Sequence, residues 1–250
     1  WCAYKNCESS RLKSIGYAIR GWYARTSRNI LDGVDVFIVQ SDFQKKKFIA
    51  QGIEAERISI VPGIAPVVEA PNGWSAGEYV SFVGRVSFEK GIDEFIEAAR
   101  MNPKLPFKVA GNVDAAYHIP EDLPKNVEFV GFLKGKDLDD FYLKSRIIVV
   151  PSKWYEGFPN VIVKGMLLGR PIVTTDIGAM QSIIRNGENG VLVPPADGRT
   201  LGEAIQKLYV DVDMCKRFGI QAMNDTGESY SREKIYSIMD DVYKNLIKKS

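Results

Sequence analysis

Residues 79–91, with the sequence YVSFVGRVSFEKG, decide the fold of this chain. The first six residues are a strand-length run that ends at Gly84, and most of them are β-branched or aromatic. The next segment has apolar residues at the helical spacing i, i+3, i+4 and i+7, namely Ile92, Phe95, Ile96 and Ala99. Such a stripe is typical of a helix that packs against a sheet. The sequence therefore predicts a strand, a short loop and a helix at this point.

The same alternation of strand and helix extends along the chain from this segment. Further strand-length runs are VDVFIV at 34–39, FKVAG at 107–111, VEFVG at 127–131, RIIVVP at 146–151 and PIVTT at 171–175. A second helical stripe contains Leu138, Phe141 and Tyr142. Several strand runs are hydrophobic without alternation, as expected for strands that are buried on both faces. We therefore expect an α/β fold in which helices cover both faces of a parallel sheet.

The chain is expected to divide around the stretch from Pro62 to Glu78, which is rich in Pro and Gly and has little helical periodicity. We place an interdomain linker at residues 66–78 and the sheet described above in a domain at residues 79–228. Residues 1–65 hold too few strand runs for a sheet of their own, so they resemble the closing segment of a preceding α/β domain whose beginning is absent. A terminal helix at 229–250 has an apolar stripe that could pack back on that domain.

The composition is that of a globular protein, with 250 residues, 45% of them hydrophobic, and a net charge of +2. This balance, without a long basic stripe, argues against nucleic-acid binding and favours small-molecule ligands. No apolar run approaches the roughly 20 residues that cross a bilayer. Cys2, Cys7 and Cys215 fit neither a disulfide framework nor a zinc pair, which favours a reducing cytoplasm. The abrupt start at Trp1 is compatible with a truncated chain.

A basic series runs through the N-terminal helical segment, with apolar residues between the charges. The basic residues are Arg11, Lys13, Arg20, Arg25 and Arg28, and the apolar residues are Ile15, Ile19 and Trp22. The pattern fits peripheral contact with an anionic membrane, at its inner face, and a solvated helix face explains it equally well.

Cations follow the strand run at 79–84. Gly84 would let the backbone approach a ligand, while Arg85 and Lys90 bring two positive charges beside a helix N-terminus. Ligands of open parallel sheets bind at the carboxyl ends of the strands, and this combination suits a diphosphate. A surface turn with solvated charges explains this short pattern equally well.

A second loop of interest follows the strand run at 146–151 and has the sequence SKWYEGFPN at 152–160. The carboxylate of Glu156 has only acceptor oxygens, which can hold two neighbouring sugar hydroxyls. Gly157 admits close backbone approach, and the helix N-terminus that follows favours a negative phosphate. Taken alone, a Glu-Gly pair is more often an ordinary turn.

Five short motifs follow one another in a recognisable order. They are G-R-x-x-x-x-K-G at 84–91, V-x-F-x-G at 127–131, P-S-x-x-x-E-G-F-P at 151–159, G-x-P-I-V at 169–173 and N-G-E-N-G at 186–190. Together they resemble the group 1 (family 4) retaining glycosyltransferases, and the resemblance runs from about Val34 to the C-terminus. It implies the GT-B architecture, in which two Rossmann-like domains face each other across a cleft. The C-terminal domain, which is most of this chain, would bind a nucleotide sugar, and the N-terminal domain would hold the acceptor.

The resemblance assigns catalytic roles to three residues. Arg85 and Lys90 match the family's diphosphate-binding pair. Glu156 matches the first Glu of an E-x7-E motif, which holds the hydroxyls of the donor sugar. The further binding residues expected from the resemblance are Gly84, Gly131, Phe132, Gly157, Phe158, Asn160 and Lys164. Of these, Gly131 and Phe132 lie where the family builds its nucleobase pocket, and the segment 157–160 matches the loop whose backbone faces the sugar and phosphate.

Lys164, eight positions after Glu156, departs from the family pattern. The family's second Glu accepts hydrogen bonds from both ribose hydroxyls at this position, and an ammonium group cannot accept any. Lys164 could instead reach the diphosphate or form an ion pair, so the site is expected either to work with altered nucleotide contacts or to be weakened. Ser182 also stands where a Glu is common, which makes the surroundings less acidic.

Two further features favour ordinary structural roles. Asp211 and Asp213 have the D-x-D spacing of metal-binding glycosyltransferases, but they fall in a polar stretch near a helix end, so no metal site is expected. The single histidine, His118, lies in an irregular segment and is expected to be solvated.

The expected activity is the transfer of a hexose from a UDP- or GDP-linked donor to a hydroxyl of a glycan or lipid-linked acceptor. The resemblance implies retention of the anomeric configuration and no metal or other cofactor. The alternative, motivated by Lys164, is a non-catalytic or regulatory module that binds nucleotide sugars. A nicotinamide-dependent oxidoreductase is disfavoured, because no G-x-G-x-x-G follows any strand run.

Overall fold

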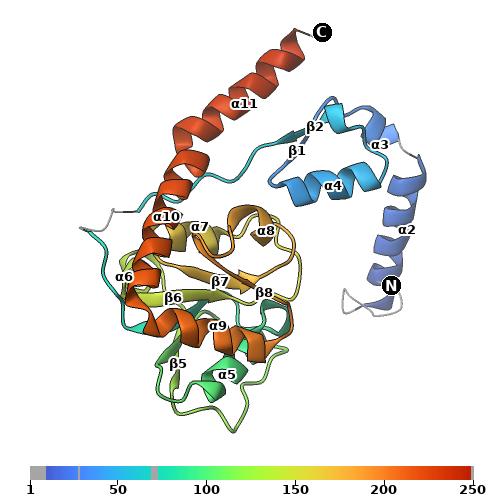
Figure 1. The fold of residues 1–250 in the computed structure, drawn as a ribbon. Helices are drawn as coiled ribbons and strands as arrows, with labels where there is room; N and C mark the ends of the chain where they lie inside the picture. The colour runs from blue at the N-terminus through green and yellow to red at the C-terminus, as the bar shows by residue number, and fades with distance from the viewer. Residues whose placement is uncertain (1–9, 28, 69–72, 249–250) are drawn as a thin grey trace.

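A sheet of six parallel strands lies at the centre of the computed structural model, which describes residues 10–27, 29–68 and 73–248 (Figure 1). The strands are β3 (Tyr79–Val83), β4 (Phe107–Ala110), β5 (Val127–Gly131), β6 (Ser145–Val150), β7 (Ile172–Thr175) and β8 (Gly190–Val193). They lie in the order β5-β4-β3-β6-β7-β8, and each strand is parallel to its neighbours. The expected α/β fold with a Rossmann-like parallel sheet is confirmed.

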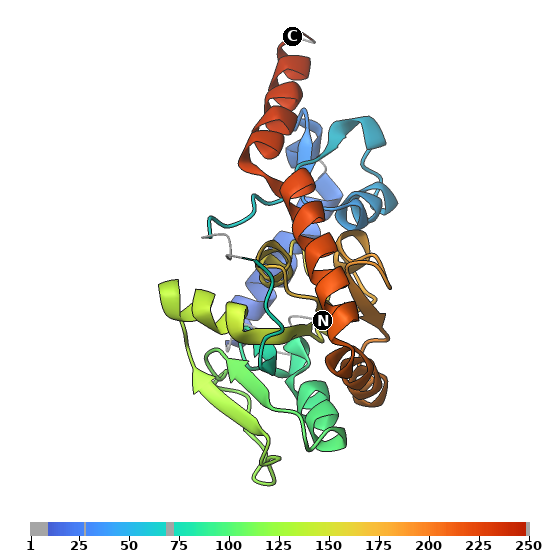
Figure 2. The same cartoon turned by 60° about the vertical axis from the view of Figure 1, so that its left-hand side comes forward.

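Helices cover both faces of the sheet, as Figures 1 and 2 show. One face carries α5 (Ile92–Met101) and α9 (Gly198–Val210), and the other carries α6 (Gly135–Lys144), α7 (Asn160–Leu167) and α8 (Met180–Ile183), while α10 (Val212–Tyr230) contacts both α7 and α9. The alternation of side chains along β6 explains this arrangement. Ile147 and Val149 belong to the core beneath α5 and α9, whereas Ile148 belongs to the core beneath α7. All three are fully buried, and each burial stabilises the fold by about 1.5–3 kcal/mol.

The direction of strand addition reverses at β3. From β3 the chain adds β4 and β5 on one side, and it then crosses to place β6 on the other side of β3. In open parallel sheets, ligands bind outside the carboxyl ends of the strands at such a switch point. The loops after β3 and β6 carry Arg85 and Glu156, so the topology brings both predicted loops to one crevice.

The residues ahead of the large sheet form a small unit of their own. It contains α2 (Arg11–Ser27), α3 (Asn29–Asp32), β1 (Phe37–Val39), α4 (Asp42–Ala50), a 3₁₀ turn η1 (Ala55–Arg57) and β2 (Ile58–Ile60), and β1 pairs with β2 in parallel. The strand predicted at 34–39 begins only at Phe37. Its partner strand β2 begins at Ile58, opposite Phe37, and the Arg57 guanidinium just before β2 donates to the carbonyl of Val34 in place of a strand.

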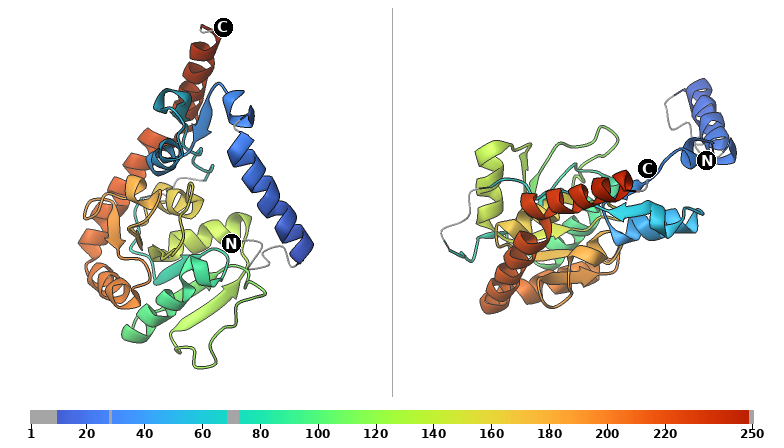
Figure 3. Two further views of the ribbon diagram at one scale, coloured as in Figure 1. Left: turned by 90° about the vertical axis from the view of Figure 1, so that its right-hand side faces the viewer. Right: turned by 90° about the horizontal axis from the view of Figure 1, so that it is seen from above.

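Helix α2 stands away from the six-stranded body (Figure 3). Its apolar residues Leu12, Ile19 and Trp22 are exposed, so the helix has an uncovered apolar stripe beside its basic residues. Arg28, Cys2 and Cys7 lie outside the described residues. Among the helices that the structure describes, none has the length and apolar composition to cross a bilayer.

The chain passes twice between the small unit and the large sheet, and the two crossings touch. The N–H of Ala65 donates to the carbonyl of Tyr230 at 2.9 Å, where α10 ends. The Tyr230 ring packs edge to face on Phe158, with the ring centroids 5.4 Å apart. Beyond this point α11 (Arg232–Ile247) extends past β2, and residues of both line a cavity of about 700 Å³.

Asp225 on α10 holds the loop that precedes β8. Its carboxylate accepts hydrogen bonds from Asn189 at 2.7 Å and from Arg185 and Gln221 at 2.9 Å each. Partial burial opposes the ionisation of Asp225, but these three donors outweigh it and lower the pKa of the carboxyl below its ordinary value of 3.8. The N-G-E-N-G motif, which contains the buried Asn189, therefore fastens this loop to α10.

We expect the Asp225→Asn variant to be less stable than the wild type near pH 7 by about 1–3 kcal/mol, because the buried Asn189 and the partly buried Gln221 lose their charged acceptor. A lowered folded-state pKa stabilises the fold above the unfolded-state pKa, and this contribution is lost as the pH falls through the folded-state value. The difference in stability should therefore shrink below about pH 4. Urea unfolding at neutral and acidic pH measures the difference in unfolding free energy between the two proteins. The control is Asp213→Asn, at an exposed position on the same helix. A difference that stays constant with pH would contradict this account.

Candidate functional site

A cavity of about 250 Å³ opens at the carboxyl ends of β3 and β6. Of the ten residues that the sequence singled out, six line this cavity: Gly84, Arg85, Lys90, Glu156, Phe158 and Asn160. The first turn of α7 borders the cavity through Asn160 and Val161, and the strands contribute the apolar Val83 and Val150. The cavity thus combines cations, one carboxylate and a helix N-terminus.

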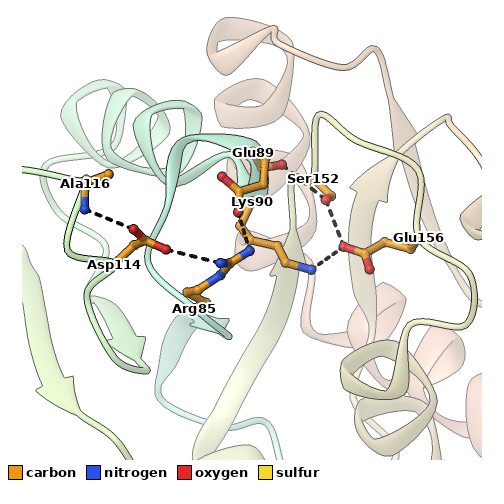
Figure 4. A network of polar contacts seen from close by, with 7 residues as sticks. All are labelled: Arg85, Glu89, Lys90, Asp114, Ala116, Ser152 and Glu156. Carbon is orange, nitrogen blue, oxygen red and sulfur yellow. Dashed lines mark hydrogen bonds and ion pairs between the residues drawn. The ribbon is translucent and has the colours of Figure 1, made fainter. Parts of the chain in front are cut away.

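Lys90 and Glu156 meet across the crevice between the two loops (Figure 4). Lys90 Nζ lies 2.5 Å from Glu156 Oε1, and Ser152 Oγ donates to the same oxygen at 2.9 Å. Among the described residues, no donor contacts the second oxygen, Oε2. The Glu156 side chain is 20% exposed, so Oε2 can accept a hydrogen bond from a hydroxyl group in the cavity.

Arg85 is held by two carboxylates on the opposite side of Lys90 from Glu156 (Figure 4). Its guanidinium lies 2.5 Å from Glu89 Oε1 and 3.1 Å from Asp114 Oδ2. Partial burial opposes the ionisation of Glu89, but the backbone N–H of Glu89 and the Arg85 guanidinium lower the pKa of this carboxyl. Because the Arg85 side chain is 55% exposed, these ion pairs orient it and add little stability.

A glycine allows the loop after β3 to approach the end of β6. Gly91 has a φ of +75°, and a Cβ there would lie 1.9 Å from the carbonyl oxygen of Pro151. The carbonyl of Glu89 also accepts from the N–H of Lys153 at 2.9 Å and from Ser152 Oγ at 3.3 Å. These contacts hold Lys90 and Glu156 at their short distance.

Four of the ten expected residues do not line this cavity. Gly131 ends β5, and the Phe132 side chain that follows is 64% exposed. Gly157 lies against α4, where a Cβ would be 2.8 Å from Gln44 Nε2. The fourth, Lys164, points to a partner on another helix.

Lys164 forms an ion pair with Asp139 of α6. Lys164 Nζ lies 2.5 Å from Asp139 Oδ1 and 5.2 Å from the centre of the Tyr142 ring. The sequence left two contacts open for Lys164, one with the diphosphate and one in an ion pair. The structure contains the ion pair.

The remaining polar candidates have local roles. Asp211 caps α10, because its side chain accepts from the N–H of Met214 at 2.8 Å. His118 is exposed, and Ser182 Oγ donates to the carbonyl of Ala179 at 2.8 Å. Within the described parts of the chain, no group of three or more His, Cys, Asp or Glu side chains is arranged to hold a metal ion.

Comparison with known families gives a match that spans all six strands of the large sheet. The family model described as glycosyl transferases group 1 matches residues 70–225, which is more than half of the chain. The chain belongs to the group 1 glycosyltransferases.

Individual relatives agree with the family. The chain is 32% identical over 187 residues to an uncharacterized 42.6 kDa protein in the cps region of Klebsiella pneumoniae, covering 73% of this chain and 48% of that protein. It is 28% identical over 182 residues to the capsular polysaccharide biosynthesis glycosyltransferase CapM of Staphylococcus aureus, covering 68% of this chain and 47% of CapM. The chain thus spans about half the length of these curated relatives.

A solved structure shares the fold of this glycosyltransferase. HepE of Anabaena, crystallised in complex with UDP and glucose, matches with a TM-score of 0.70 and 21% sequence identity. The match covers 85% of this chain and 62% of HepE. At this level of identity the likeness establishes the fold of the chain.

Several residues at or near the candidate site were not singled out from the sequence. Ser152, Glu89 and Asp114 orient the charged side chains, and Asp139 pairs with Lys164. The position of Asp114, shortly after the strand next to β3, was an available signal, because residues beyond neighbouring parallel strands share one edge. No comparable signal marked Asp139, which lies within a helix.

Proposed function

We propose that this group 1 glycosyltransferase moves a hexose from a UDP- or GDP-linked donor to a hydroxyl of a glycan or lipid-linked acceptor. In this proposal the anomeric configuration is retained and no metal is required. The observation that carries the proposal is the contact of 2.5 Å between Lys90 and Glu156 in one cavity, because a cation there would suit the diphosphate and a carboxylate would suit the hydroxyls of the donor sugar.

The diphosphate would lie between Lys90, Arg85 and the N-terminus of α7. Both side chains line the cavity, and the first turn of α7 borders it. A helix N-terminus attracts phosphate through its backbone N–H groups and its dipole. Arg85 would exchange a carboxylate partner for a phosphate oxygen, a change that its exposed position allows.

The donor sugar would lie against Glu156 and the loop that follows it. Oε2 of Glu156 would accept a hydrogen bond from a sugar hydroxyl, while Lys90 and Ser152 keep the carboxylate in place through Oε1. The backbone of Gly157, Phe158 and Asn160 completes this subsite. Gly131 and Phe132, at the end of β5, would contact the nucleobase.

Catalysis would depend on stabilising the leaving group. The bond between the sugar C1 and the phosphate oxygen breaks as the acceptor oxygen bonds to C1 on the same face. The acceptor proton passes to the departing phosphate oxygen. Negative charge on the diphosphate grows during this step, so Lys90, Arg85 and the α7 N–H groups stabilise the transition state more than the bound donor.

The remaining parts of the chain would serve the acceptor. We assign residues 1–65 to the closing segment of an acceptor-binding domain, residues 66–78 to a linker, residues 79–228 to the donor domain and residues 229–250 to a helix that returns to the first domain. The uncovered apolar stripe of α2, with basic residues beside it, would suit contact with an anionic membrane at its cytoplasmic face.

A second function is favoured by one observation. The Lys164 ammonium cannot accept hydrogen bonds from the ribose hydroxyls, and it already forms an ion pair with Asp139. A chain with weakened nucleotide contacts could serve as a non-catalytic or regulatory module that binds nucleotide sugars.

Proton NMR of the protein with UDP- and GDP-hexoses and a panel of glycan acceptors tests the proposal. We expect a new glycosidic bond with the anomeric configuration of the donor, formed at a rate that EDTA does not change. An inverted product would contradict retention, and a loss of rate in EDTA would contradict metal independence. Calorimetric binding of the donor without any turnover would favour the module.

A further inference from the structure

The Lys164–Asp139 pair does not line the proposed donor cavity but lies about one helical turn beyond it along α7. Asn160 lines the cavity, and Lys164 lies four residues further along α7, on the same face of the helix and about 6 Å along its axis. The cavity residues Val83, Val150 and Val161 pack in the same core as Tyr142, and the Lys164 ammonium lies over the Tyr142 ring. The pair therefore lies on the side of the cavity that is furthest along α7 from Glu156.

A nucleoside diphosphate bound as proposed would extend in this direction. Its sugar lies at Glu156 and its diphosphate at the N-terminus of α7, so the ribose follows along α7 toward Lys164. A ribose presents two neighbouring hydroxyl groups, which need acceptors. An ammonium has no acceptor, but the carboxylate beside it has two oxygens.

The two oxygens of Asp139 have different surroundings. Oδ1 is buried and lies 2.5 Å from Lys164 Nζ as an ion pair, without a hydrogen bond from any described residue. The Asp139 side chain as a whole is 35% exposed, and no described residue donates to Oδ2. A charged acceptor is thus held in place by Lys164, which is itself only 16% exposed, with one oxygen left for a ligand.

We propose that Asp139 is the residue that recognises the ribose of the donor, with Lys164 as the positioning residue that holds it. The carboxylate is supplied by α6, across from the position on α7 where the sequence has a lysine. This inference rests on the proposed function, because it requires a nucleotide in the cavity. Asp139 selects a ribonucleotide by accepting from the 2′-hydroxyl, which a deoxynucleotide lacks.

Isothermal calorimetry with UDP, GDP, 2′-deoxy-UDP and 2′-deoxy-GDP tests the inference on the protein. We expect the wild type to bind the ribonucleotide at least about 10-fold more tightly than its 2′-deoxy counterpart, the effect of a hydrogen bond to a charged group. Asp139→Ala should reduce this ratio to below about 2-fold, with the affinity for the deoxynucleotide little changed. Asp140→Ala removes the same charge from an exposed position on the same helix and should keep the wild-type ratio.

A second variant controls for the loss of the ion-pair partner of Lys164 in Asp139→Ala. The double variant Asp139→Ala/Lys164→Met removes both charges, and it should also bind the two nucleotides with similar affinity. Retention of the 10-fold ratio by either variant would overturn the inference, as would a wild type that binds both nucleotides equally. A wild type that binds none of the four nucleotides would overturn the proposed function and, with it, this inference.

Discussion

Replacing Lys90 with alanine is expected to lower the turnover number for sugar transfer by about 10²- to 10³-fold, while the KM for the donor changes far less. Lys90 Nζ is fixed 2.5 Å from Glu156 in the donor cavity, so its charge lies beside the diphosphate of the proposed complex. The charge on that diphosphate is larger in the transition state than in the bound donor. Loss of the cation therefore affects the rate more than the binding.

The matched control is Lys104→Ala, which removes an exposed lysine away from the cavity. Its turnover number should match that of the wild type. Lys90→Ala is expected to keep its fold, because Ser152 still donates to Glu156 after the lysine is removed. A variant that lost affinity for the donor but kept its turnover number would place Lys90 in binding alone.

The Gly91→Ala variant should lower the free energy of unfolding by about 2–5 kcal/mol, and the melting temperature by roughly 5–15 °C. Two penalties combine at this residue. A φ of +75° is unfavourable for any residue with a Cβ, and the added Cβ would lie 1.9 Å from the carbonyl oxygen of Pro151. Neither atom can move away without shifting the end of β6. The variant should also lose activity, because the same contact positions Lys90 and Glu156.

Gly187 provides a control that separates the two penalties. Its φ is +82°, but a Cβ there would meet no atom within 4 Å. Gly187→Ala should therefore show only the conformational cost of about 1–2 kcal/mol and no loss of activity. Equal effects of the two substitutions on the melting temperature would mean that the contact with Pro151 does not constrain the loop.

The sheet and its helices could be predicted because their signals are local. Residues 147–150 are a continuous apolar run, and 79–83 is interrupted only by Ser81. Strand β6 sends alternate side chains into two different cores, as strands buried on both faces must. The strand at 34–39 was predicted too long, because the run starts at Val34, whose carbonyl accepts a hydrogen bond from the distant Arg57 and not from a strand. That contact spans 23 positions, and no local pattern reveals it.

The candidate site divides in the same way. Arg85, Lys90 and Glu156 follow strand ends, and the order of the strands brings them together, so position along the sequence was enough to select them. The partner of Lys164 depends instead on how α6 packs beside α7, and several carboxylates of α6 were equally available in the sequence. The choice of Asp139 was therefore beyond prediction from one sequence.

The carboxylates that hold Arg85 and Lys90 also determine how a donor approaches. Arg85 and Lys90 carry two positive charges, and Glu89, Asp114 and Glu156 carry three negative ones, so this network of five side chains has a net charge of −1, although Glu156 is the one carboxylate of the three that lines the cavity. Such a site does not attract a nucleotide sugar from a distance, and its encounter rate should depend little on ionic strength. The affinity for the diphosphate then arises only at contact, when phosphate oxygens replace carboxylate oxygens as partners of Arg85 and Lys90. These contacts therefore determine how long the donor stays bound.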